Sequence, residues 1–527
     1  MTAAADLIFT DAAVHTLADT TEDGTTTANG TTADGEPTAE AVAVRDGEIV
    51  RIDSDDEIRF LEGVETEVVS LDGRVLLPGF IDAHTHLQHL GRSLVYADLS
   101  AADSPGDCVE LLAENRQTES DWILGFSYDE STWTESRYLT REDLDQVSED
   151  RPVAAFREDM HIAAVNSAAL ERHEDEMPAA DVKREQNEPT GVIVEEAVDV
   201  IYEAIEPGRA EMRKLLAAAQ ENAHSKGVTA VHDMVRDSRA PEVYRQMELS
   251  GDLALRVRLN YWTDHLDALV ETGLVTNHGS EFVEVGAIKS FTDGSLGGRT
   301  AKLSEPYADA DGETGQWVVS PDELEEFVQR ADEAGLQFTA HAIGDEAVDA
   351  VLSAYEKTEN PGEARHRVEH AELTDDESVE RFAESGVIAS VQPNFLKWAR
   401  EDGLYEDRLG TERRENSNRF ADLLNAGAHL AFGSDCMPLD PLFGIHQAVN
   451  APAEPQRLSV TQALRAYTEG AAYAGFAEER LGTIEVGKKA DFVALERSPW
   501  NHPEDIQNID VAMTVVDGEV VYDGREN

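Results

Sequence analysis

Short apolar runs recur between about residues 77 and 480, and longer charged segments separate them. The runs are 122–127, 227–233, 283–291, 336–344, 367–371, 386–393 and 429–435. The segment 321–335 (PDELEEFVQRADEAG), which lies between two of them, has the composition of an exposed helix. Strands and helices that alternate roughly every 30 to 50 residues are typical of a parallel sheet or barrel. The pattern therefore predicts an α/β fold.

The two ends of the chain differ from this middle region. Residues 41–52 (AVAVRDGEIVRI) and 511–524 (VAMTVVDGEVVYDG) each predict two strands joined at an Asp-Gly turn. Residues 6–16 predict a further strand, and the polar segment 19–38 predicts a surface loop. Because chain termini often lie close together, we expect both ends to form one small β-domain. The stretch 95–225 is too long for one strand–helix unit, so we expect an inserted subdomain there.

The charge of the chain limits its partners. It has 43 Lys and Arg residues against 107 Asp and Glu residues, a formal net charge of −64. At molar salt the Debye length falls to about 3 Å, which screens the self-repulsion of such a surface. We interpret the acidity as adaptation to a salt-rich cytoplasm, as in halophilic proteins. No basic patch is available to neutralise phosphates, which argues against nucleic acid as a partner.

Cysteine content and hydropathy indicate the compartment. Only Cys108 and Cys436 occur, which excludes a disulfide framework and suits a reducing cytoplasm. No apolar run approaches the roughly 20 residues that cross a bilayer, and the first residues lack the basic segment of a signal peptide. We expect a soluble cytoplasmic protein with no membrane partner. A homodimer is the commonest default for its assembly.

Polar residues stand where the apolar runs end, which is where functional side chains cluster in a (β/α)8 barrel. The stretch 78–87 (PGFIDAHTHL) places His84 and His86 on one face of a strand, where both imidazoles can bind one cation. Later runs end in the same way at Lys289, His341, His370 and Asp435. A histidine at a strand end is more often a core residue than a ligand. Five such coincidences in one order favour a metal site.

Lys289 is one of nine lysines in the chain and lies in an apolar run, where an unpaired ammonium is costly. One interpretation pairs it with Asp293 or Glu284. The other is a lysine whose lowered pKa lets the neutral amine take up CO2, so that the carbamate bridges two cations as a carboxylate does. We favour the second interpretation, and the first stays open.

Asp435, in GSDCMPLDP (433–441), follows the last strand. An ionised Asp there can bind a metal and take a proton from metal-bound water. A loop or helix cap is the alternative explanation for an Asp after Gly-Ser. We interpret the neighbouring Cys436 as a small filler rather than a ligand.

The order His-x-His, Lys, His, His, Asp resembles the metal-dependent amidohydrolase superfamily. The flanking sequence is similar to its YtcJ-like (amidohydrolase 3) branch. The matching stretches are LPGFIDAHTHL (77–87), GFSYDESTW (125–133), GVTAVHD (227–233), KSFTDGSLGGRTAKLSEPYAD (289–309), HAIGDEAVD (341–349), RVEHAELTD (367–375), SVQPNF (390–395), FGSD (432–435) and GTIEVGKKADFVAL (482–495). The resemblance implies a (β/α)8 TIM barrel with an insertion (77–484) and a composite β-sandwich domain from both termini (1–76 and 485–527).

Carried over by position, the resemblance also implies a metal centre. One set of ligands, His84, His86 and Asp435, would bind the more buried ion. Carbamylated Lys289 would bridge to a second ion held by His341 and His370. Zinc is the expected ion for a His-rich site, with manganese or iron as alternatives. Hydroxide generated there would attack a polarised carbonyl, and Asp435 would pass its proton to the leaving amine.

Other matching residues have two explanations each. The candidate substrate-binding residues are Tyr128, Trp133, His161 and Arg299, for which packing and loop order are equally good explanations. We expect His232 and Asp233 to lie behind the metal ligands. The remaining histidines His89 and His446 are interpreted as structural.

Three functions compete on this fold. The favoured one is hydrolysis of a non-peptide carbon–nitrogen bond in a small amide, such as an N-substituted formamide or an N-acyl amine. A deaminase or cyclic-amide hydrolase is the second, although Lys289 favours a bridged metal pair over the single metal typical of deaminases. A non-catalytic binding or regulatory barrel is the third, and it would not require the proton-shuttling Asp435.

Overall fold

The computed structural model describes residues 4–18, 35–115, 121–130, 133–157, 162–236 and 238–526. The chain forms two compact units. Unit 1 comprises Met1–His86 and Gln220–Asn527, and unit 2 comprises Leu87–Ala219.

Eight strands form the centre of unit 1, and each neighbouring pair is parallel. In spatial order they are β7 (Phe80–Thr85), β14 (Val228–Val235), β15 (Arg256–Trp262), β16 (Val283–Phe291), β17 (Gln337–Ala342), β18 (Arg367–His370), β19 (Ile388–Val391) and β20 (Leu430–Phe432). The first and eighth strands meet, because the Asp82 carboxylate accepts from Ser434 N (2.9 Å) and the His84 carbonyl accepts from Asp435 N (2.8 Å). The predicted (β/α)8 barrel is confirmed.

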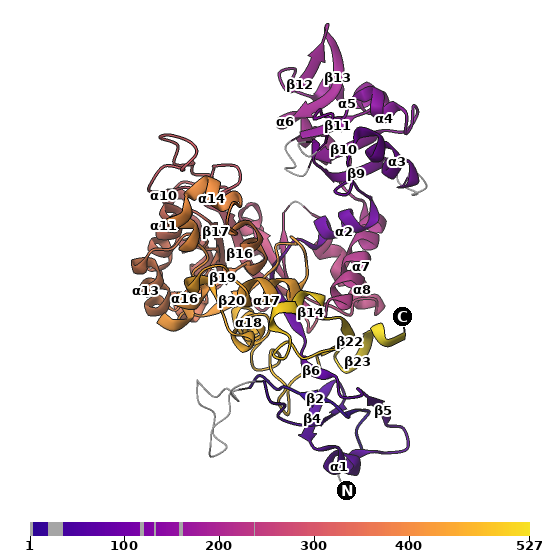
Figure 1. Cartoon of the computed structure of the whole chain (residues 1–527), viewed down its shortest axis with the longest axis vertical. Coiled ribbons are helices and arrows are strands. Elements are labelled where there is room, and N and C mark those ends of the chain that lie inside the picture. Colours follow the sequence, from indigo (N-terminus) through magenta and orange to yellow (C-terminus); the bar gives the residue numbers. More distant parts are fainter. Residues whose placement is uncertain are drawn as a thin grey trace. The chain divides into compact units, whose positions relative to one another are not determined.

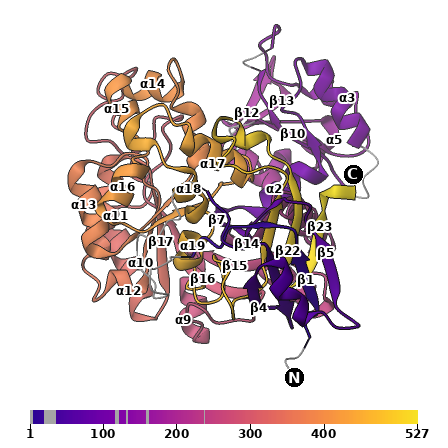
Figure 2. The same cartoon turned by 60° about the horizontal axis from the view of Figure 1, so that its bottom comes forward.

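Helices surround these strands, and Figure 2 shows α11, α13 and α16 on the outside of β7, β14 and β17. The main helices are α8 (Ala240–Ser250), α9 (Leu266–Thr272), α10 (Pro321–Glu333), α11 (Asp345–Tyr355), α13 (Asp376–Ser385), α16 (Phe420–Ala426), α17 (Pro441–Val449), α18 (Val460–Ala466) and α19 (Glu469–Ala474). The expected helix 321–335 is α10, which begins after the N-cap Ser320 and ends before Gly335. Because helices cover the outside of the barrel, its strands are buried on both faces and form near-continuous apolar runs.

Strands from both termini form two further sheets of unit 1, as expected. One sheet has the order β4 (Glu48–Asp53), β3 (Ala41–Arg45), β1 (Leu7–Thr10) and β5 (Glu67–Ser70). The other has the order β2 (Ala13–Val14), β6 (Val75–Pro78), β21 (Phe492–Leu495), β22 (Val511–Val516) and β23 (Glu519–Asp523). In Figure 1 the indigo β2 and β6 lie beside the yellow β22 and β23.

One core joins the two terminal sheets, and Phe9, Val42, Leu76, Phe492 and Val515 belong to it. Both Asp-Gly turns have positive φ at each residue, as a two-residue hairpin loop requires (53° and 74° at the first, 52° and 81° at the second). The expected strand 6–16 is split, because Asp11 has φ 50°. Most of the expected loop, 19–34, lies outside the described residues. The boundaries 76/77 and 484/485 stay predictions, since the β-domain and the barrel lie in the same compact unit.

Unit 2 is the inserted subdomain. Its sheet has the order β12 (Val182–Glu185), β13 (Glu188–Val194), β11 (Ile162–Val165), β10 (Val153–Arg157), β9 (Ile123–Tyr128) and β8 (Ala97–Asp98). Its helices are α2 (Leu87–Val95), α3 (Pro105–Asn115), α4 (Arg141–Asp145), α5 (Ser167–His173) and α6 (Glu196–Ala204), while α7 (Arg209–Ser225) crosses into unit 1. The unit has apolar cores of its own, one around Phe126 and Phe156 and another around Leu112 and Tyr128. The expected bounds 95–225 stay a prediction.

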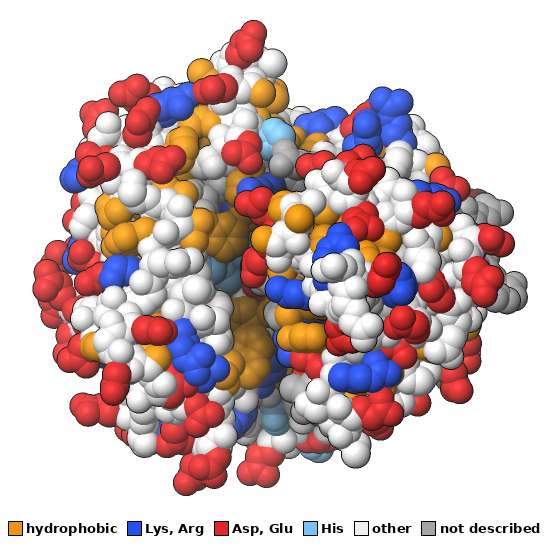
Figure 3. Space-filling view, turned by 90° about the horizontal axis from the view of Figure 1, so that it is seen from above, with side chains coloured by type: hydrophobic (Ala, Val, Ile, Leu, Met, Phe, Trp, Pro, Cys, Tyr) orange, Lys and Arg blue, Asp and Glu red, His pale blue; other side chains and the backbone are white. Residues whose placement is uncertain are grey.

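The surface carries the acidity of the sequence. Figure 3 shows many more Asp and Glu side chains than Lys and Arg side chains on the face in view. Within the described ranges, no helix is both long and apolar enough to cross a bilayer.

Candidate metal centre

The six candidate ligands all lie at the carboxyl ends of barrel strands, the end that carries active sites in this fold. His84 lies in β7 and His86 directly follows it, and Asp435 lies three residues after β20. Three neighbouring strands carry the others: Lys289 in β16, His341 in β17 and His370 in β18.

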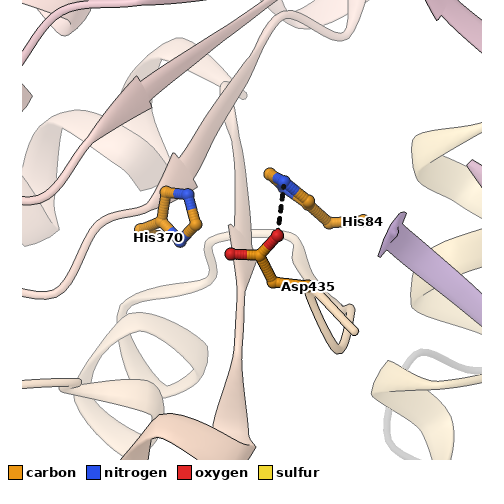
Figure 4. A group of neighbouring side chains, drawn as sticks. All are labelled: His84, His370 and Asp435. Atoms are coloured by element: carbon orange, nitrogen blue, oxygen red, sulfur yellow. Dashed lines mark ion pairs between the residues drawn. The ribbon is translucent and has the colours of Figure 1, made fainter. Parts of the chain in front are cut away.

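Three of these residues, His84, His370 and Asp435, converge on one point. Their nearest ligand atoms all lie within 4.8 Å of one another, and Figure 4 shows the side chains turned toward a common space. His84 Nε2 lies 3.6 Å from Asp435 Oδ1, and His86 Nε2 lies 3.2 Å from the same oxygen. The rings of His341 and His370 are edge to face, with centroids 4.4 Å apart. The structure therefore brings the four histidines and Asp435 together.

Hydrogen bonds set the tautomer of two of the histidines. His84 Nδ1–H donates to Glu369 Oε2 (2.6 Å), which leaves the Nε2 lone pair for a ligand. His341 Nε2–H donates to the Gly294 carbonyl (2.9 Å), which leaves its Nδ1 lone pair. Burial lowers the pKa of His84, of His341 (to about 3) and of His370, and the nearby Lys289 charge lowers each further. These imidazoles are therefore neutral at physiological pH, as metal ligation requires.

The backbone is strained at two ligand positions. His370 has φ 73° and Asp435 has φ 53°, values that non-glycine residues rarely adopt. Hydrogen bonds on either side hold the two turns: Ala371 N donates to the Ala342 carbonyl (2.9 Å), and Asp435 N donates to the His84 carbonyl. Such conformations cost of order 1–3 kcal/mol each and cluster at functional sites. Each turn aims its side chain across the end of the barrel.

Lys289 lies among these groups with 1% of its surface exposed. Within the described part of the chain, its Nζ has no hydrogen-bond partner. The pairing with Asp293 or Glu284 that the sequence left open is absent. The Asp293 carboxylate instead accepts from the backbone N–H groups of 302, 343 and 344, and Glu284 pairs with Arg258 and Arg480. Burial lowers the pKa of Lys289 to about 8, although the Glu369 and Asp435 charges oppose the shift.

The surroundings of Asp435 favour its charged form, whereas burial disfavours the charged form of Lys289. Burial raises its pKa, but the hydrogen bond from His86 and the nearby charge of Lys289 lower it more, to about 2. The carboxylate is therefore ionised at neutral pH and can accept a proton. The Sγ of Cys436 beside it accepts from the backbone N–H of His86 (3.3 Å), and the interpretation of Cys436 as a small filler stays a prediction.

A buried chain of polar groups behind His84 was missed from the sequence. Glu369 and Arg367, both fully buried, pair at 2.7 Å in β18. Thr339 also donates to Glu369, and Arg367 Nη1 donates to His232 Nδ1 (2.8 Å). The signal lay in RVEH (367–370), because residues two apart on a strand share a face. The prediction that His232 lies behind a ligand agrees with this chain, whereas Asp233 accepts from Tyr244 OH (2.8 Å).

Three of the four candidate substrate-binding residues have contacts with other residues, and the fourth lies outside the described residues. Tyr128 and Trp133 are buried in a core of unit 2 and stack on each other, with centroids 5.7 Å apart. Arg299 makes two hydrogen bonds to Asp309 (3.0 and 2.6 Å). His161 lies outside the described residues. Their role in substrate binding stays a prediction.

Comparison with known proteins places this geometry in a family. The sequence profile of the amidohydrolase family (Amidohydro_3) matches residues 67–522. The chain belongs to the amidohydrolase family. It is 34% identical to the putative amidohydrolase YtcJ of Bacillus subtilis (strain 168), over 92% of this chain and 96% of the relative. The expected YtcJ-like branch is thereby confirmed.

Two further amidohydrolase relatives inform the fold and the chemistry. A crystal structure of an uncharacterized metal-dependent hydrolase from Pyrococcus furiosus is 30% identical, with a TM-score of 0.79 over 94% of this chain and 99% of that chain. The N-substituted formamide deformylase of Arthrobacter pascens is 26% identical over 92% of this chain and 95% of its own length.

The residues present fit the divalent metal that such an amidohydrolase requires. Neutral imidazoles and an ionised carboxylate form the donor set around His84, His370 and Asp435, which suits zinc and other borderline transition metals. His370 Nδ1 is buried and has no hydrogen-bond partner in the described ranges. Glu369 holds the Nδ1–H of His84, as carboxylates behind metal-bound histidines commonly do.

Proposed function

We propose that this amidohydrolase cleaves a non-peptide carbon–nitrogen bond in a small amide at a divalent metal site. The observation that carries the proposal is the convergence of His84, His370 and Asp435 within 4.8 Å at the carboxyl end of the barrel. His84, His86 and Asp435 would hold one ion, and His341 and His370 would hold a second. Zinc is the ion that the donor set favours.

Lys289 completes the site when it is carbamylated. As an ammonium among three imidazoles it repels a cation. The ammonium first loses one proton; the neutral amine then attacks the carbon of CO2, an N–C bond forms as one C=O π bond opens, and a second proton leaves the nitrogen, so that the charge of the side chain changes from +1 to −1. The buried Nζ, which has no hydrogen-bond partner among the described residues, and its pKa of about 8 support this reaction. The two carbamate oxygens would then bridge the two ions.

Asp435 is the proton carrier of the proposed reaction. A bound divalent cation supplies Lewis acidity, which polarises the scissile carbonyl and lowers the pKa of water. The ionised Asp435 accepts a proton from the attacking water and returns it to the nitrogen of the leaving amine, which departs only once protonated.

The substrate class follows from this proton transfer and from the relatives. A carboxylate that delivers a proton to nitrogen suits an amine leaving group. The Arthrobacter pascens relative is an N-substituted formamide deformylase, which supports N-substituted formamides and N-acyl amines as the first compounds to test.

The test combines metal analysis with a substrate panel. Protein expressed in metal-replete medium and purified in high salt should retain transition metal by elemental analysis. It should release amine from formamides or N-acyl amines faster than it opens cyclic amides or deaminates amino-heterocycles. Ammonia release from the heterocycles alone would indicate a deaminase instead. Absence of bound metal would contradict the enzyme proposal.

A further inference from the structure

A lysine without a carboxylate partner lies beside the metal centre. The chain has nine lysines, and six of them are not exposed. Four of these six pair with a carboxylate at 2.6–3.0 Å, namely Lys226, Lys302, Lys488 and Lys489. The two that make no such pair among the described residues are Lys289 and Lys397. Because Lys289 belongs to the candidate metal centre, only Lys397 is left without a role.

The short 3₁₀ helix η5 (Pro393–Trp398), which carries this lysine, is attached to the metal centre at two points. It begins one residue after β19, at the carboxyl end of the barrel. Asn394 Nδ2 donates to the Ser434 carbonyl (2.7 Å). The Phe395 ring stacks on the His370 ring, with centroids 5.9 Å apart and an interplanar angle of 6°. The helix is therefore held next to candidate ligands on both of its neighbouring strands.

The ammonium of Lys397 lies on the loop that carries Asp435. Its Nζ donates to the Met437 carbonyl (2.9 Å) and lies 4.4 Å from the centroid of the Trp398 ring. Met437 follows Asp435 by two residues, so their Cα atoms are at most about 7 Å apart. An ammonium has three N–H donors. Two of them have no acceptor among the described residues.

No negative charge compensates this ammonium. Burial lowers the pKa of Lys397, and no neighbouring charge opposes the shift. The acidic residue of the same loop, Asp440, pairs with Lys226 (2.6 Å) and accepts from Phe443 N (3.1 Å). A partly buried cation without a counter-charge is costly. The chain has 107 acidic residues, so acidic side chains are not scarce.

Solvent reaches both the metal centre and this lysine. The side chains of His86 and Asp435 are 24% and 18% exposed. Met437 is 47% exposed, and the hydrogen bond that its carbonyl accepts from Lys397 is exposed as well. A bound molecule can therefore contact the free N–H donors of Lys397 without displacing a protein partner.

We propose that Lys397 binds the carboxylate of the substrate, which is an N-formyl or N-acyl amino acid. The inference rests on the proposed function, in which Asp435 protonates the leaving nitrogen. Because Lys397 contacts the same loop two residues further on, the carboxylate belongs to the amine part of the substrate, one carbon from that nitrogen. The N–H donors of the ammonium would form charge-assisted hydrogen bonds to it. Trp398 and Met437, both partly exposed, offer contacts to an apolar side chain.

Hydrolysis of matched substrates tests the proposal with the metal-loaded, full-length protein in one high-salt buffer. Both enantiomers of N-formylphenylalanine are compared with those of N-formylphenylalanine amide, in which a neutral carboxamide replaces the carboxylate. The acid should be favoured by about 10- to 100-fold in kcat/KM, chiefly through KM, which is the effect of one hydrogen bond to a charged group. Lys397→Met should remove most of this preference, and Lys397→Arg should keep it. Lys357→Met, at an exposed lysine that pairs with Glu325, should behave as the wild type.

Two further measurements separate recognition from a structural role. Calorimetric titration of Asp435→Asn, which lacks the proton carrier, should show tighter binding of the acid than of the amide without turnover. N-benzylsuccinamic acid carries its carboxylate on the acyl part, so Lys397→Met should affect its hydrolysis no more than that of the neutral amide.

The outcomes distinguish this proposal from the proposed function. Equal kcat/KM for acid and amide in the wild type would overturn the role of Lys397 and leave the amide hydrolase intact. Equal losses for both compounds in Lys397→Met would show that the lysine only ties η5 to the loop, which also overturns the proposal. No turnover of any compound in the panel would overturn both proposals.

Discussion

Lys289 and Asp435 lie in the same buried region, and both have lowered pKa values. The shift favours the neutral form of the lysine and the charged form of the aspartate. Burial lowers the pKa of the Lys289 ammonium to about 8, while the hydrogen bond from His86 and the charge of Lys289 hold the pKa of Asp435 at about 2. At neutral pH the Asp435 carboxylate is a proton acceptor, and part of the Lys289 population is the neutral amine. Groups with strongly shifted pKa values that face one another across a strand end are typical of catalytic sites.

Lys289→Ala should lose the second metal equivalent and lower kcat/KM by roughly 10²-fold or more, because the bridging carbamate is absent. Elemental analysis and amine-release kinetics measure both effects. Lys357→Ala, which removes a half-exposed lysine that pairs with Glu325, is the matched control and should behave as the wild type. Wild-type metal content and turnover in Lys289→Ala would contradict the carbamate.

Reactivation of metal-stripped protein should depend on dissolved CO2 and on pH. Because Lys289 must be neutral to react, the rate at constant CO2 should rise as the pH increases through about 8 and level off above it. Stopped assays after addition of metal and bicarbonate measure this rate. A rate that is independent of CO2 would show that no carbamate forms.

Glu369→Gln should weaken metal binding about 10- to 100-fold, because Glu369 orients His84 and Gln leaves Arg367 without its charge partner. Competition with a chromophoric chelator measures this affinity independently of turnover. Glu325→Gln, far along the surface of α10, serves as the control. Unchanged affinity would show that the pair is only structural.

At the scale of elements, short turns after the barrel strands position the chemistry. The loop after β16 is fastened by Asp293, which accepts from Lys302 N (2.8 Å), Ile343 N (3.0 Å) and Gly344 N (2.8 Å). The same loop presents the Gly294 carbonyl to His341 Nε2. The Asp293 carboxylate thus holds together the loops after β16 and β17, and the first of these loops orients the candidate ligand His341.

Asp293→Ala should lower the free energy of unfolding by about 2–4 kcal/mol, since two buried N–H groups and one partly buried N–H group lose their acceptor. Urea denaturation measures the loss, and hydrogen exchange of residues 294–302 should increase. Asp322→Ala, at the first turn of α10, is an exposed control for which we expect a change of roughly 0.5 kcal/mol or less. Unaltered exchange in the loop would contradict the fastening role.

At the scale of the whole molecule, the net charge of −64 opposes the compact state. We propose that the protein is adapted to concentrated salt. Its two units have separate apolar cores, and the repulsion between acidic side chains opposes the compact state of each unit. Oligomeric state and cellular compartment stay predictions.

The Tm should rise steeply between about 0.1 and 2 M ionic strength as the Debye length falls from about 10 Å to 3 Å or less. Both potassium glutamate and potassium chloride should produce this rise, because screening depends on ionic strength and not on which anion is present. Differential scanning calorimetry at pH 7 measures it. A Tm that does not change with ionic strength would contradict the halophilic interpretation.

Much of the fold and of the candidate site was predictable, because the signals are local. Apolar runs, Asp-Gly turns and the His-x-His stretch each lie within about ten residues, and all six candidate ligands stand at strand ends as expected. The partners of Lys289 were not predictable, because Asp293 and Glu284 are near in sequence but bind other groups. The burial of Tyr128 and Trp133 in an apolar core of unit 2 could not be predicted from the sequence either.

The sequence by itself determined the barrel, the composite β-domain, the family and the six residues at the strand ends, since periodicity and turn chemistry act over short distances. Only the tertiary structure decided what lies behind those residues. His84 meets Glu369 from 285 positions away, and Arg258 shares Glu284 with an arginine 196 positions from that glutamate. Such pairings depend on barrel closure and register, which bring distant side chains together in a low-dielectric interior where a missing partner has the largest effect.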